Sequence, residues 1–84
     1  MTKLEQKLIS LGYKQMEFPK EHYKKVIDDH FIIYDTFSNS SWAVYNFEEA
    51  ELDAELDAEL DIELVRKIEF ERQKDLEVLK NVED

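Results

Sequence analysis

The chain is short, strongly acidic and free of cysteine. It has 84 residues, a net charge of −10 and no Cys, so we expect one small domain that depends on its hydrophobic core and not on disulfides or thiolate metal sites. A deep catalytic cleft is not expected at this size. No apolar run approaches the roughly 18 residues of a membrane span, and no basic start leads into an apolar block. These features predict a soluble cytoplasmic protein.

A first helix is predicted over residues 1–12. Thr2 and Glu5 have the spacing of a capping box, in which each side chain accepts a hydrogen bond from the other residue's backbone. Gly12 supplies the left-handed residue that ends many helices. Apolar residues recur between them at helical spacing, at Leu4, Leu8 and Leu11.

Residues 13–47 predict a small antiparallel sheet of three to four strands. Three runs rich in β-branched and aromatic residues are separated by turn-like segments: HYKKVI, FIIYDTF and WAVYNF. A short edge strand within YKQMEF would be the fourth. In the second run Phe31 and Ile33 share one face and Ile32 and Tyr34 the other, so we expect helices to cover at least one of two apolar faces.

A long helix is predicted over residues 47–81. Asn46 and Glu49 supply the start signals, and apolar residues form a stripe further on: Val65, Ile68, Leu76, Leu79 and Val82. Arg72 and Asp75 interrupt this stripe. Apolar and polar residues alternate strictly from Ala50 to Leu64, which is the pattern of a strand, but fifteen residues is too long and Ala, Leu and Glu are strong helix formers.

The predicted fold class is therefore α+β, with one domain over residues 1–84. The first helix and residues 64–82 are expected to pack on one face of the sheet. The predicted core consists of Leu8, Leu11, Ile33, Val44, Ile68 and Leu79.

Residues 48–64, which we call the acidic segment, read EEAELDAELDAELDIEL and contain nine acids and no base. On a helix this ELDA repeat places a leucine ridge between a stripe of Asp and a stripe of Glu, and each stripe drifts by about 40° per unit. The candidate binding residues are Glu51, Leu52, Asp53, Glu55, Leu56, Asp57, Glu59, Leu60, Asp61 and Glu63.

The negative charge lies in one half of the chain. Residues 1–47 hold six Lys and six acids, whereas residues 48–84 hold fifteen acids and five bases and so carry the whole −10. Direct binding to nucleic acid or to an anionic membrane is therefore disfavoured, and a basic protein partner is favoured. Acids on both sides of the leucine ridge would also repel a copy of the same ridge.

No catalytic residue, metal ligand or cofactor site is predicted. His22 and His30 lack the spacing of a metal pair and are expected on the sheet surface. The serines near residue 40 lack a glycine-flanked nucleophile elbow, and the acidic repeat lacks the glycine-centred calcium loop. We expect the aromatic residues to pack in the core or on the sheet faces and not to form a stacking platform: Tyr13, Tyr23, Tyr34, Trp42 and Tyr45.

Two segments, LEQKLISLGYK at residues 4–14 and QKDLEVLK at residues 73–80, resemble the two ends of small proteins encoded by phages and prophages of Gram-positive bacteria. That resemblance implies a helix, a small antiparallel sheet and a long helix. The ELDA repeat departs from the family pattern. Some small acidic phage proteins inhibit host nucleases by occupying nucleic-acid sites, and no motif transfers this property residue by residue.

Three interpretations of the acidic segment remain open. The first is a protein-interaction module that docks on a basic partner surface, in its strongest form a nucleic-acid mimic that inhibits a host nuclease or DNA-binding protein. The second is a structural or assembly protein that self-associates through its long helix. The third is a solvated helix without any ligand, since charge runs are usually solvated. None of the three requires catalysis.

Overall fold

The computed structural model describes residues 2–46 and 55–82, except for the side chains of residues 55–61. Its elements in chain order are α1 (Lys3–Ser10), β1 (Lys14–Gln15), β2 (His22–Ile27), β3 (His30–Asp35), β4 (Ser40–Val44) and α3 (Glu55–Lys80). The α+β fold class is thus confirmed. The predicted start of the long helix, at residues 47–54, lies outside the described residues.

The helix α1 begins with the predicted capping box. Thr2 Oγ1 accepts from the backbone N–H of Glu5 at 3.1 Å, and Glu5 Oε1 accepts from that of Thr2 at 3.4 Å. The helix ends at Ser10, before Gly12, whose φ of 100° is costly for any residue with a Cβ. Tyr23 Oη donates to Glu5 at 3.1 Å and so joins α1 to β2.

The sheet is an antiparallel meander in the order β1-β2-β3-β4. Asp28 and Asp29 alone connect β2 to β3, and both have positive φ, at 49° and 68°. This is the backbone pattern of a type I′ turn, whose twist matches that of the flanking strands, and aspartate tolerates it better than most residues do. The predicted edge strand is present as β1, which is only two residues long.

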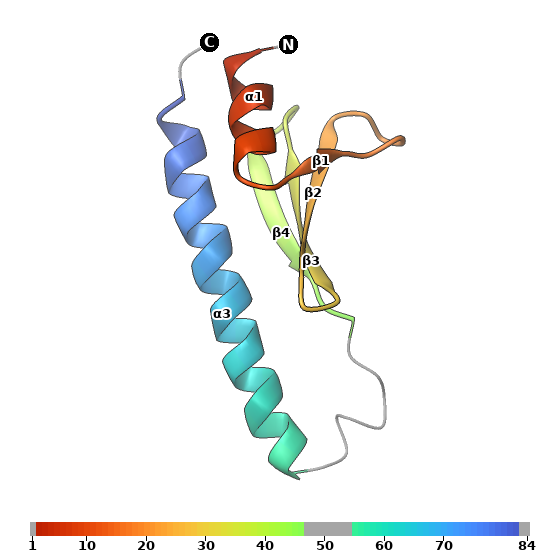
Figure 1. Cartoon of the computed structure of the whole chain (residues 1–84), viewed down its shortest axis with the longest axis vertical. Coiled ribbons are helices and arrows are strands. Elements are labelled where there is room, and N and C mark those ends of the chain that lie inside the picture. The colour runs from red at the N-terminus through yellow and green to blue at the C-terminus, as the bar shows by residue number, and fades with distance from the viewer. Residues whose placement is uncertain (1, 47–54, 83–84) are drawn as a thin grey trace.

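Both helices lie on the same side of the sheet (Figure 1). Strand positions alternate between the two faces, and the helices cover the face that carries Tyr23, Ile32 and Tyr34. There the core cluster forms between sheet and helices, from Leu8, Tyr13, Tyr23, Ile32, Tyr34, Ile68 and Leu79. We call this the inner face of the sheet and the opposite one the outer face.

Three of the six predicted core residues belong to that cluster: Leu8, Ile68 and Leu79. Leu11 packs against the cluster and is only partly buried. The other two, Ile33 and Val44, occupy outer-face positions opposite Trp42 and Phe31. Ile33 is nevertheless buried, whereas Val44 is half-buried.

Ile68 is a fully buried residue of α3 in the core cluster. Its exposed fraction is 0%, so replacing it with alanine should leave a cavity and lower the free energy of unfolding by about 2–5 kcal/mol. Urea denaturation measures this loss. The matched control is Ile62→Ala on the same helix, since Ile62 is 51% exposed and should change stability by about 0.5 kcal/mol or less. Equal losses in the two variants would contradict the packing.

Candidate functional site

The predicted binding residues lie at the beginning of α3 or just before it. Glu51, Leu52 and Asp53 fall outside the described residues. Six others are part of the helix, although their side chains are outside the described part: Glu55, Leu56, Asp57, Glu59, Leu60 and Asp61. Glu63 is described and is exposed. From Glu55 onward, the alternating apolar and polar segment is therefore helix, as its residue types predicted.

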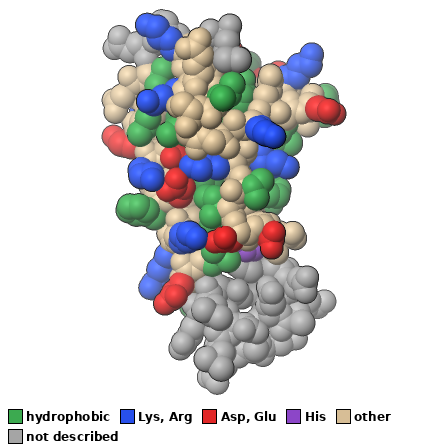
Figure 2. All heavy atoms as spheres, in the orientation of Figure 1, with side chains coloured by type: hydrophobic (Ala, Val, Ile, Leu, Met, Phe, Trp, Pro, Cys, Tyr) green, Lys and Arg blue, Asp and Glu red, His purple; other side chains and the backbone are tan. Residues whose placement is uncertain are grey.

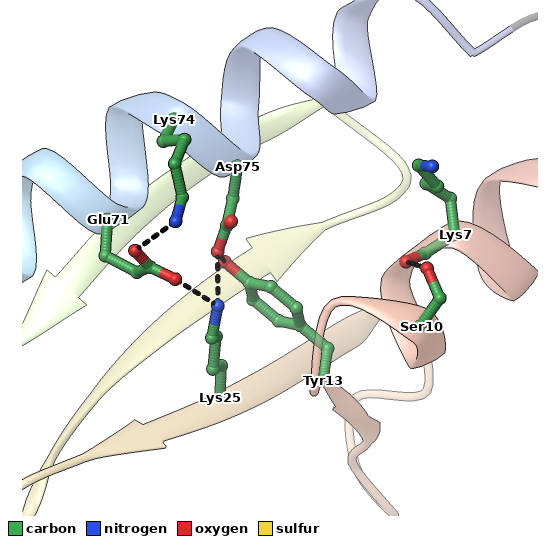
Figure 3. Close-up of polar contacts among 7 residues, drawn as sticks. All are labelled: Lys7, Ser10, Tyr13, Lys25, Glu71, Lys74 and Asp75. Carbon is green, nitrogen blue, oxygen red and sulfur yellow. Dashed lines mark hydrogen bonds and ion pairs between the residues drawn. The ribbon is translucent and has the colours of Figure 1, made fainter.

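The other half of α3 is attached to the sheet through a buried ionic cluster (Figure 3). Lys25, on the inner face of β2, donates to Asp75 at 2.9 Å and to Glu71 at 2.8 Å. Tyr13 Oη also donates to Asp75, at 3.0 Å. Asp75 is 1% exposed, so its carboxylate is taken out of water and depends on these two donors.

The cluster shifts the pKa values of Tyr13, Lys25 and Glu71. Burial raises the pKa of Tyr13 far above its ordinary value of 10.0, and the neighbouring Asp75 charge raises it further. Burial lowers the pKa of Lys25, but hydrogen bonds to Glu71 and Asp75 outweigh it and the net shift is upward. Hydrogen bonds from Lys25 and Lys74 lower the pKa of Glu71. A protonated phenol and a paired ammonium have no acid–base role at neutral pH, so the cluster is structural.

A second attachment joins α3 to the edge strand β4. Arg72 Nη1 donates to the carbonyl and to the hydroxyl of Ser41, at 3.1 and 3.0 Å. The same guanidinium forms a two-point ion pair with Glu69. Hydrogen bonds from Arg72, and then from Gln73, lower the pKa of Glu69 to about 2. Arg72 thus covers part of the open edge of the sheet and neutralises an acid of α3.

These contacts compensate three of the acids in the packed half of α3. Glu69 is paired with Arg72, Glu71 with Lys25 and Lys74, and Asp75 with Lys25. Figure 2 shows cationic and anionic side chains interspersed over the described part of one face of the molecule. The acidic segment contains no base of its own, so the negative surplus of the chain is concentrated there.

The two histidines have different environments. His22 lies half-buried on the outer face, with its ring edge-on to Trp42 at 5.2 Å and its Nε2 3.8 Å from Asp35. His30 was expected on the surface, but it is 4% exposed. It shares the inner face with Ile32 because the two positions are two apart in β3, and its Nδ1 accepts from the backbone N–H of Asn46 at 2.6 Å.

The described residues offer little for chemistry on a bound molecule. No group of three or more His, Asp or Glu side chains among them could hold a metal ion. A hollow between α1 and the end of α3 is lined by two titratable side chains, Tyr34 and Lys80. No helix in the described part of the chain is long and apolar enough to cross a membrane.

Sequence reasoning missed the roles of Arg72 and Asp75, which were noted merely as interruptions of the apolar stripe. The missing signal is general: a charged residue in the buried phase of a helix needs a partner of opposite charge. Lys25, in a strand position whose neighbours Tyr23 and Ile27 share its face, was the candidate partner. Their pairing could not be derived, because the register of α3 on the sheet was unknown.

Removal of the Asp75 carboxylate tests the cluster. Asp75→Leu leaves the Tyr13 hydroxyl without its acceptor and Lys25 with one carboxylate instead of two, so we expect a loss of about 3–5 kcal/mol in urea denaturation. Glu77→Leu, at an exposed position on the same helix, is the control and should change stability by about 0.5 kcal/mol or less. A loss below about 1 kcal/mol for Asp75→Leu would show that the cluster does not hold α3 in place.

The ion pair of Glu71 should also appear in the pH dependence of stability. Its pKa is lowered from 4.5 in the folded chain, so the stabilisation is fully present above about pH 5 and is lost as the pH falls through the lowered value. The difference in unfolding free energy between the native chain and Glu71→Gln should therefore be constant from pH 7 to about 5 and shrink at more acid pH. A difference that grows toward acid would have the wrong sign.

Comparison of the chain with protein-family models, with curated proteins and with solved structures gives no match. The relation to small phage proteins therefore stays a prediction from two short segments. What the chain binds has to be inferred from its own charges and contacts.

Proposed function

We propose that the protein is a binding module without catalytic activity, which docks its acidic segment on a basic surface of another protein. The observation that carries this proposal is the uneven distribution of charge along the chain. In the packed half of α3, Glu69, Glu71 and Asp75 are paired with Arg72, Lys25 and Lys74, whereas residues 48–64 hold nine acids and no base of their own. A local excess of negative charge attracts a partner of opposite charge.

The attachment of α3 supports this role mechanically. The helix is continuous from Glu55 to Lys80, and its later turns are fixed by Ile68, Arg72 and Asp75. Its first turns extend past the β2–β3 turn, beyond the sheet (Figure 1). A helical docking element that continues from a fixed helix loses less conformational entropy on binding than a free peptide would.

The partner chemistry follows from the spacing of the acids. Carboxylates beside leucines suit a surface on which Lys and Arg flank an apolar groove, as a nucleic-acid-binding protein presents. In this proposal the chain acts in the cytoplasm of a bacterial host and is of phage origin, and its strongest form is competition with nucleic acid for a nuclease or DNA-binding protein. Self-pairing of the leucine ridge is the weaker alternative, because it would bring like charges together.

Affinity capture with matched charge variants tests the proposal. The test variant carries Asp53→Asn, Glu55→Gln, Asp57→Asn and Glu59→Gln. The native chain, immobilised in a bacterial lysate, should retain a basic protein that added salt elutes. At about 0.3–0.5 kcal/mol for each surface charge, the test variant should retain that protein about tenfold less.

The control removes four exposed acids elsewhere, through Glu17→Gln, Glu21→Gln, Asp29→Asn and Glu77→Gln. Both variants lose the same total charge, so a difference between them reports where the acids lie and not how many there are. The control should retain the partner as the native chain does. If the test variant and the native chain capture the same proteins equally, the acidic segment is a solvated helix and the proposal fails.

A further inference from the structure

The outer face of the sheet is not covered by any described element, since α1 and α3 both lie on the other side (Figure 1). Its centre is apolar. Ile33 lies in register between Lys24 and Trp42, and the next row contains Val26, Phe31 and Val44. Contiguous exposed apolar patches on a protein surface often mark interaction sites.

The side chains on this face are already arranged as a packed layer. The rings of His22 and Trp42 meet across β3 at 5.2 Å, and Lys24 Nζ lies 5.1 Å from the centre of the Phe31 ring. Ile33 is only 4% exposed although no helix covers it, so its own sheet neighbours shield it. Trp42 and Val26 remain 39% and 64% exposed. An apolar centre with a polar rim is the arrangement of a protein interface.

The charges of this face differ from those of the rest of the chain. Its strand positions carry Lys14 and Lys24 and a single acid, Asp35. That acid faces His22 and accepts from the backbone N–H of Phe37 at 2.9 Å. In a chain of net charge −10, two copies that meet through this surface bring one acid each, Asp35, into the contact and keep the acids of α3 out of it.

We propose that a second copy of the chain covers the outer face, so that the two sheets pack face to face around Ile33, Phe31 and Trp42. Stacked sheets lie about 10 Å apart and a helix is about 10 Å across. The two α3 helices would then be roughly 30 Å apart on opposite outer sides, beyond the Debye length of about 8 Å at physiological salt. Pairing through α3 itself would place the acids within about 10 Å of each other.

The size of the face sets the strength of the dimer. Four strands spaced by about 4.8 Å and about six residues of 3.3 Å each give a footprint of about 20 by 20 Å. That is smaller than the roughly 800 Å² per partner of a standard interface, so the dimer should be weak and should form at micromolar to millimolar concentrations. Each copy keeps its acidic segment free, and the dimer therefore presents two docking elements.

Trp42 is the single tryptophan of the chain and lies within the proposed interface. Sedimentation equilibrium from about 10 µM to 1 mM should show the mass rising from 10.1 kDa toward twice that value, and the Trp42 emission should shift to the blue over the same range. Val26→Glu places an acid in the interface, opposite Phe31, at an exposed position. It should weaken association by at least about tenfold.

The matched control is Phe70→Glu, since Phe70 is 70% exposed on α3 and lies outside the outer face. It should associate like the native chain. A native chain that stays at the monomer mass up to 1 mM overturns the proposal and leaves the face to a partner of another chemistry. Association that Phe70→Glu abolishes and Val26→Glu does not would overturn it in favour of α3. Neither result depends on the capture experiment, so the two proposals can fail separately.

Discussion

The buried carboxylate of Asp75 is the constraint on which the rest of the structure depends. It cannot be solvated where it lies, so Lys25 and Tyr13 have to reach it from the sheet and from the loop after α1. Because those donors come from different parts of the chain, one helical position determines where α3, the sheet and the end of α1 meet. The apolar contacts around Ile68 bury surface but are not directional, so they allow more than one position of α3 on the sheet. The hydrogen bonds of the ionic cluster are directional and select one of these positions.

The same cluster separates the charges of the chain. Lys25, Lys74 and Arg72 compensate acids in the packed turns of α3, whereas residues 48–64 contain no base of their own. The chain is thus divided into a compensated body, an acidic segment and an outer sheet face nearly without free acid. The proposed docking on a basic protein uses the acidic segment, and the proposed pairing of two copies uses the outer face of the sheet. The two proposed contacts therefore do not compete for the same surface.

Sequence-based reasoning left open which face of β3 the helices cover. Successive residues of a strand point to opposite faces of the sheet, so Ile32 and Ile33 lie on different faces. Because both are apolar, the sequence did not show which face the helices cover. The structure places Ile32, Tyr34 and His30 beneath the helices. It leaves Ile33 and Val44 on the outer face, where Trp42 and its neighbours shield Ile33. The prediction of a surface position for His30 was wrong for the same reason, because the covered face of β3 was not known.

The sequence by itself determined the local structure. The capping box at Thr2, Gly12 at the end of α1, the β-branched strand runs and the helix formers after Glu55 act within a few residues, so their effect does not require knowledge of the fold. It also determined the location of the excess charge. Only the tertiary structure decided which sheet face is covered, that Arg72 and Asp75 are attachments instead of interruptions, and which acids are compensated. Those properties depend on pairs such as Lys25 with Asp75, fifty residues apart in the chain, and local patterns contain no information about such pairs.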